Sequence, residues 1–153
     1  MLLLRHASAG ERPSAASLDR ARRLDRIGRA DARSLPEALA EHAIERIVSS
    51  PHARCVETVQ ALARSRTLRV ELRDELLPDA SAEDVRALLD ELPDATLLCT
   101  HRETIAALFG GGLTCEKGGT WLVERRDGGH APVAYLPPPS VALRSHEPAA
   151  APA

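Results

Sequence analysis

Residues 1–10 of the chain read MLLLRHASAG, and this stretch decides the fold. The apolar run Leu2–Leu4 breaks at once into the polar pair Arg5-His6. Short apolar runs of this kind are typical of strands that are buried on both faces of a sheet. The same pattern returns at residues 96–100 (TLLCT), which are followed by His101. We therefore expect two buried strands, each with a histidine at its carboxyl end.

The rest of the chain alternates between strand and helix patterns. Further strands are predicted at residues 44–49 and 68–72, and helices at residues 24–42, 52–66 and 105–109. Ser81 and Asp84 resemble a capping box before another helical run. Two apolar segments around Asp127-Gly128-Gly129 predict a β-hairpin at residues 121–123 and 133–135. Residues 8–20 are predicted to be a loop, and the prolines at 137–139 to end the sheet.

Strands that alternate with helices predict an α/β fold. We expect a three-layer α/β/α sandwich with a mostly parallel central sheet. No linker or internal repeat divides the chain. The expectation is a single domain over residues 1–144, followed by a disordered C-terminal tail over residues 145–153.

Composition excludes several classes of function. Aromatic residues make up only 2% of the 153 residues, which argues against a stacking platform for single-stranded nucleic acid. The net charge of −2 argues against a general polyanion binder, although 19 of the 20 basic residues are arginine. The three cysteines form no CxxC pair, so reduced thiols are expected rather than a disulfide framework or a zinc site. No apolar run is long enough for a signal peptide or a membrane span, which favours a cytoplasmic protein with no membrane partner.

The strand-end histidines are the strongest functional signal. Ligands of open α/β sheets bind beyond the carboxyl ends of the strands, so His6 and His101 are expected to face one pocket. Arg5 adds a positive charge beside His6, and Arg54 lies one helical turn after a third strand end. Planar arginine forks and imidazoles at one place suit a phosphoryl group. A neutral histidine can attack phosphorus and carry the phosphoryl group covalently, and such a site requires no metal or other cofactor.

Three motifs in order resemble the histidine phosphatase (phosphoglycerate-mutase-like) superfamily, over roughly residues 1–136. Arg5-His6-Ala7 is similar to its RHG signature, with alanine where glycine is usual. The second motif is matched by Ser49-Ser50-Pro51 with Arg54 and Thr58, and the third by the strand that ends at His101. Asp25-x-x-Gly28 resembles the helix start after the first loop.

This resemblance implies that His6 accepts the phosphoryl group and that Arg5, Arg54 and His101 hold it. The short chain is most similar to the SixA branch, whose named activity is phosphohistidine phosphatase. Larger members place a glutamate as general acid where this chain has Pro78, which leaves Asp79 and Glu75 as candidates for the acid. Lack of that glutamate favours a phosphoramidate substrate, because a histidine leaving group carries or easily acquires its own proton.

Two alternatives stay open beside a phosphohistidine protein as substrate. In the first, the substrate is a small phosphomonoester or nucleotide, and Asp79 or Glu75 acts as the acid. In the second, the chain is a degenerate member that binds phosphorylated ligands without turnover, which the departures at Ala7 and Arg102 motivate. Arg102 is either a further substrate contact or a solvent-facing side chain.

Other charged residues are given structural interpretations. Residues 20–33 contain six arginines interleaved with Asp19, Asp25 and Asp31, which predicts a solvated, charge-paired helix face rather than a nucleic-acid patch. Such a face could also help to recruit an acidic protein substrate. The histidines outside the motifs have no partner pattern and are predicted at the surface: His42, His52, His130 and His146.

Overall fold

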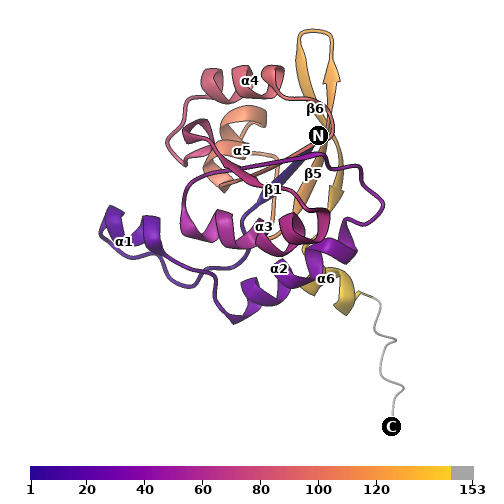
Figure 1. Ribbon diagram of the computed structural model, residues 1–153. Coiled ribbons are helices and arrows are strands. Elements are labelled where there is room, and N and C mark those ends of the chain that lie inside the picture. Colours follow the sequence, from indigo (N-terminus) through magenta and orange to yellow (C-terminus); the bar gives the residue numbers. More distant parts are fainter. Residues whose placement is uncertain (146–153) are drawn as a thin grey trace.

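The computed structural model describes residues 1–145, in which six strands form one sheet with the order β3-β2-β4-β1-β5-β6 (Figure 1). The strands are β1 (Leu2–Arg5), β2 (Arg46–Ser49), β3 (Val70–Leu72), β4 (Thr96–Thr100), β5 (Thr120–Arg126) and β6 (Gly129–Leu136). The helices are α1 (Ala16–Ala21), α2 (Arg26–Ala38), α3 (Ala53–Arg66), the 3₁₀ turn η1 (Asp74–Leu76), α4 (Ala82–Glu91), α5 (Arg102–Phe109) and α6 (Pro139–Arg144). Strands β1 to β4 are parallel, and the β5–β6 hairpin joins β1 in antiparallel fashion.

Alternating side chains of β1 enter two separate cores, which gives the sheet its three layers. Leu2 and Leu4 pack in the core that contains residues of α2 and α3. Leu3 packs in the other core, with residues of α4 and α5. Period-two alternation with both faces apolar is what a central parallel strand requires. The predicted α/β/α sandwich with a mostly parallel sheet is therefore confirmed.

Two helices differ from the sequence-based expectation. The predicted loop at residues 8–20 contains the start of α1, which projects from one side of the molecule (Figure 1). The prolines do end the sheet at Leu136, but Pro139 then begins α6, because proline fits the first turn of a helix where no backbone donor is needed. The predicted tail lies, apart from Ser145, outside the described residues. No helix within residues 1–145 is long and apolar enough to cross a membrane.

The loop after β1 is held in place by residues at the start of α2 and in α3. The Asp25 carboxylate caps α2 at Gly28 N and also accepts hydrogen bonds from Ser8 Oγ at 2.6 Å and Gly10 N at 3.0 Å. A Cβ at Gly28 would lie 2.0 Å from the Ser8 carbonyl oxygen, so only glycine permits this approach. Thr58 of α3 accepts from Ala7 N at 3.0 Å. These contacts hold the carboxyl end of β1 in one position.

Candidate active site

The two strand-end histidines meet at one edge of the sheet. Strands β1 and β4 are paired in parallel, and His6 N donates to Thr100 O at 3.0 Å. The ring centroids of His6 and His101 are 5.4 Å apart in an edge-on arrangement. His6 is 6% exposed and His101 is fully buried. The structure thus brings the two histidines together, and a shared pocket for a phosphoryl group stays a prediction.

One hydrogen bond fixes the tautomer of His6. Its Nδ1 lies 2.8 Å from Ala7 O, and a carbonyl oxygen only accepts, so Nδ1 carries the proton. The lone pair of Nε2 is then free, and Arg54 Nε donates to it at 3.3 Å. His6 therefore presents an unprotonated nitrogen to the guanidinium of Arg54, as a nucleophile must.

Burial keeps both imidazoles neutral. Desolvation, followed by the charges of Arg54 and Arg5, lowers the pKa of His6 from 6.5 to about 3, although its backbone hydrogen bond opposes the shift. Desolvation, followed by the neighbouring His6 and Arg54, lowers the pKa of His101 to about 2. At neutral pH both rings are consequently uncharged, and the fixed positive charge of the cluster comes from arginine.

This burial should make the stability of the protein depend on pH. The pKa of His6 is below its unfolded value, so its contribution is complete above pH 6.5 and is lost as the pH falls from 6.5 toward 3. Between pH 6.5 and pH 5 we expect His6 alone to lower the free energy of unfolding by about 2 kcal/mol. Urea unfolding of the wild type and of His6→Gln at both pH values measures this, and identical pH dependence in the two proteins would contradict it.

The buried guanidinium of Arg54 contacts three other residues of the cluster. It is 2% exposed, and besides His6 it contacts Asp19 and His101. Its Nη1 donates to Asp19 O at 2.7 Å, and its Nη2 lies 3.3 Å from Asp19 Oδ2 and 3.4 Å from His101 Nδ1. Arginine only donates, so His101 Nδ1 accepts and His101 Nε2 donates to Ser50 Oγ at 2.8 Å. The guanidinium thus lies between the two imidazoles with its orientation fixed by α1.

Asp19 is a site residue that sequence reasoning missed. It lies on α1, inside the segment predicted to be a loop, and its side chain is buried. Arg22 Nε donates to Asp19 Oδ1 at 3.0 Å, so the carboxylate bridges Arg22 and Arg54. Desolvation raises the pKa of Asp19, but Arg54 and Arg22 together outweigh it and the net pKa is lowered. The only sequence signal was an aspartate among arginines, which also occurs on exposed helices.

Arg5 lies beside this cluster rather than within it. Its Nη1 donates to Cys115 O at 2.7 Å, and its Nε is buried without a partner among the described residues. It lines a separate cavity of about 610 Å³ together with the exposed Arg102 and with Glu103. The charge of Arg5 still acts on His6, whose pKa it lowers. Its predicted contact with a phosphoryl group stays a prediction.

The two candidate acids differ in their surroundings. Glu75 accepts from Arg73 at 2.7 Å, and this hydrogen bond lowers the pKa of Glu75. Asp79 is exposed and lines a cavity of about 480 Å³ together with Asp19 and His52. Asp79 therefore shares a cavity with residues of the cluster, whereas Glu75 does not line that cavity.

His52 corrects the prediction that it lies at the surface. It is only 7% exposed, and its ring packs edge-on against His101 with centroids 4.9 Å apart. Desolvation and Arg54 lower its pKa. His130 is also less exposed than predicted, since its side chain is 4% accessible. The signal for His52 was its place between Pro51 and Arg54, directly before α3.

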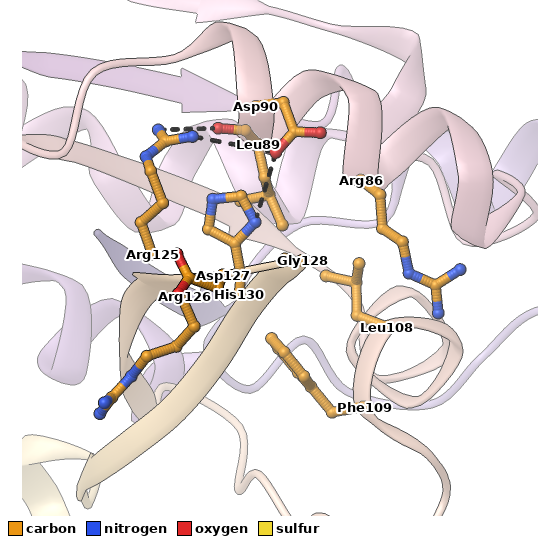
Figure 2. Close-up of a pocket in the computed structure, with 11 residues that line it drawn as sticks. Arg86, Leu89, Asp90, Leu108, Phe109, Arg125, Arg126, Asp127, Gly128 and His130 are labelled. Atoms are coloured by element: carbon orange, nitrogen blue, oxygen red, sulfur yellow. Dashed lines mark hydrogen bonds and ion pairs between the residues drawn. The ribbon is translucent and has the colours of Figure 1, made fainter.

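A further cavity of about 660 Å³ lies elsewhere (Figure 2). Its walls come from α4, the end of α5 and the tip of the β5–β6 hairpin. Thr120 at the start of β5 pairs with Leu4, so the hairpin tip lies toward the opposite edge of the sheet from His6. In this cavity Asp90 already faces Arg125 and His130. Within residues 1–145, no group of three or more histidine, cysteine or acidic side chains is placed to hold a metal ion.

Two comparisons of the sequence with known proteins found matches. The family model of the histidine phosphatase superfamily (branch 1) matches residues 1–77. A curated relative, the 8-oxo-(d)GTP phosphatase of Mycolicibacterium smegmatis, is 29% identical over 157 residues, which cover 91% of this chain and 48% of the relative. The chain thus spans about half the length of that relative.

Solved structures show the same fold. A SixA chain from Agrobacterium tumefaciens superposes with a TM-score of 0.72 at 24% identity, covering 90% of this chain and 97% of that one. The protein histidine phosphatase SixA, complexed with tungstate, gives 0.73 at 21% identity, with 92% and 97% covered. A phosphoserine phosphatase variant from Entamoeba histolytica gives 0.70 at 13% identity, with 88% and 94% covered.

Proposed function

The chain belongs to the histidine phosphatase superfamily (branch 1), and on this premise we propose that it is a phosphatase that works through a covalent phosphohistidine on His6. The observation that carries the proposal is that Arg54 donates both to His6 Nε2, at 3.3 Å, and to His101 Nδ1, at 3.4 Å. A nucleophilic lone pair, a guanidinium fork and a neutral imidazole at one point suit phosphoryl transfer.

The reaction proceeds in two steps. The Nε2 lone pair of His6 forms a bond to phosphorus, and the leaving group departs with the electron pair of its own bond to phosphorus. Arg54 then donates to phosphoryl oxygens in place of His6, where charge develops in the transition state. In the second step water attacks phosphorus, the bond to Nε2 breaks, and inorganic phosphate leaves with His6 neutral again.

We propose phosphohistidine in proteins as the substrate. The site residues include no free buried carboxylic acid: Glu75 is held by Arg73, and Asp19 is held by Arg54 and Arg22. A phosphoramidate tolerates this better than an alkyl phosphate, because its leaving imidazole can carry the proton it needs. The buried, unpaired thiols of all three cysteines fit the cytoplasmic setting expected for such a substrate.

Small phosphomonoesters or nucleotides are the second candidate. Two observations favour it: the similarity to an 8-oxo-(d)GTP phosphatase, and the position of Asp79 at a cavity of about 480 Å³ beside the site. In that case Asp79 would protonate the leaving oxygen. A positioned general acid contributes about 10²- to 10⁴-fold to the rate of such a step.

A substrate panel separates the two candidates. We expect the highest kcat/KM for a phosphohistidine peptide, compared with sugar phosphates and nucleotides, and no inhibition by EDTA. Asp79→Asn should change phosphohistidine turnover by less than about threefold, because no carboxylic acid is needed. The matched control is Asp127→Asn, which changes an exposed aspartate at the hairpin turn.

Two outcomes would contradict phosphohistidine as the substrate. A higher kcat/KM for a nucleotide, lost in Asp79→Asn, would favour the second candidate. Tight phosphate or vanadate binding without any turnover would indicate the degenerate, binding-only protein.

A further inference from the structure

The three aspartates that interrupt the arginine-rich segment are all turned away from its surface. Asp19 is buried against Arg54, and Asp25 caps α2 and holds the loop after β1. Asp31 is buried and accepts from Ser140 N at 2.7 Å and from Ser140 Oγ at 3.1 Å, which anchors α6 beside α2 (Figure 1). The predicted charge pairing therefore holds for Arg22 and Arg23, which pair with Asp19 and Glu57, but these three aspartates pair with no arginine of α2.

The arginines of α2 remain on the outside. Arg26, Arg29 and Arg33 are exposed and recur at a spacing of three and four residues, which places them on one side of the helix. The opposite side carries the buried Gly28, Asp31, Ala32 and Leu35. The side chains of Arg26 and Arg33 make no hydrogen bond or ion pair to any residue within 1–145, whereas Arg29 Nη1 donates to Leu24 O. We call Arg26, Arg29 and Arg33 the arginine face.

Two further exposed arginines lie outside the arginine face, one on α1 and one on α6. Arg20 on α1 is exposed, has no ion pair within the described chain, and lines the cavity that also contains His52 and Asp79. Beside the face, a second cavity of about 650 Å³ contains Arg26, the exposed Arg144 and the 60% exposed Ile27. Exposed arginines thus occur both on α1, beside the cluster of His52 and Asp19, and on α2.

We propose that the arginine face is a docking surface for an acidic segment of the protein that carries the phosphorylated histidine. This inference rests on the proposed function and adds a recognition element outside the catalytic cluster. Charge complementarity at exposed residues raises the rate of encounter and sets partner preference more than it adds affinity. The shortage of aromatic residues and the net charge of −2 favour a protein over a nucleic acid as the partner.

Matched peptides test the docking surface. Two phosphohistidine peptides of equal length are compared, one with four glutamates beside the histidine and one with four glutamines. We expect kcat/KM at low salt to be about tenfold higher for the acidic peptide, and the preference to shrink as salt screens exposed charges. In Arg26→Glu/Arg33→Glu the preference should disappear, while turnover of p-nitrophenyl phosphate stays within twofold of wild type. Arg64→Glu/Arg86→Glu, which changes the same net charge at exposed arginines elsewhere, should keep the preference.

A binding measurement tests the docking surface without any phosphoryl transfer. Fluorescence anisotropy of the unphosphorylated acidic peptide should show binding to wild type that Arg26→Glu/Arg33→Glu loses, whether or not phosphohistidine is the true substrate. Equal kcat/KM for both peptides together with no binding of the acidic peptide would overturn the docking surface and leave the phosphatase proposal standing. Retained preference in the double variant would overturn it as well. Binding of a single-stranded oligonucleotide at the same arginines, without peptide binding, would assign the surface to nucleic acid instead.

Discussion

Replacing His6 with alanine should lower kcat for p-nitrophenyl phosphate by about 10⁴-fold or more, because the covalent route then has no nucleophile. The structure supplies the reason in atomic terms: Nδ1 is occupied by Ala7 O, Nε2 is unprotonated, and burial lowers the pKa of the ring to about 3. His101, the other imidazole that contacts Arg54, has a different geometry. His101 Nε2 is bonded to Ser50, and its Nδ1 receives Arg54.

The control for this variant is His42→Ala. His42 is partly buried and lies between α2 and β2, away from the strand ends that carry the site. We expect its kcat to stay within twofold of wild type. Circular dichroism and urea unfolding show whether each variant is folded. Full activity in a folded His6→Ala protein would remove the proposed mechanism.

Arg54→Lys should lower kcat/KM by about 10²- to 10³-fold, although the positive charge is kept. A lysine ammonium is a point charge without a planar fork, so it cannot reach His6, His101 and the Asp19 carboxylate together. Loss of one preorganised donor to a developing oxyanion has an effect of this size in other enzymes. Breaking the buried pair with Asp19 should also lower the free energy of unfolding, by up to about 3 kcal/mol.

The matched control is Arg64→Lys on the same helix, where the side chain is exposed. It should leave both kcat/KM and stability unchanged. Steady-state kinetics with p-nitrophenyl phosphate and vanadate inhibition measure the effect on the site. An Arg54→Lys protein with wild-type kcat/KM would show that the guanidinium does not hold the phosphoryl group.

Sequence patterns were sufficient for the sheet and for the convergence of His6, Arg54 and His101. Leu2–Leu4 and the run that ends at Thr100 are buried strands because every side chain in them is apolar or small enough to enter a core. Parallel pairing of these strands then brings His6 and His101 together without further information. Arg54 follows from the second motif, since the turn at Pro51 places it one helical turn after β2.

The parts that could not be predicted depend on contacts between distant residues. Helix α1 has six residues and no side-chain cap, so its local signal is weak. Its position depends on the Asp19–Arg54 pair, whose partners are 35 residues apart. The direction of Arg5 depends on the Cys115 carbonyl, and the burial of His52 depends on His101. The arginine-rich segment seemed balanced in sequence because periodicity cannot show that its aspartates turn inward.

The most direct test of the central claim is to trap the phosphoenzyme. The wild-type protein is mixed with a phosphohistidine peptide or p-nitrophenyl phosphate, quenched in base within one turnover, and digested for mass spectrometry. We predict one phosphoryl group on the peptide that contains His6, stable in base and labile in acid, and absent from His6→Ala. A protein that turns over substrate at the wild-type rate while no phosphoryl group is trapped on His6, or while it is trapped on another residue, would contradict the account.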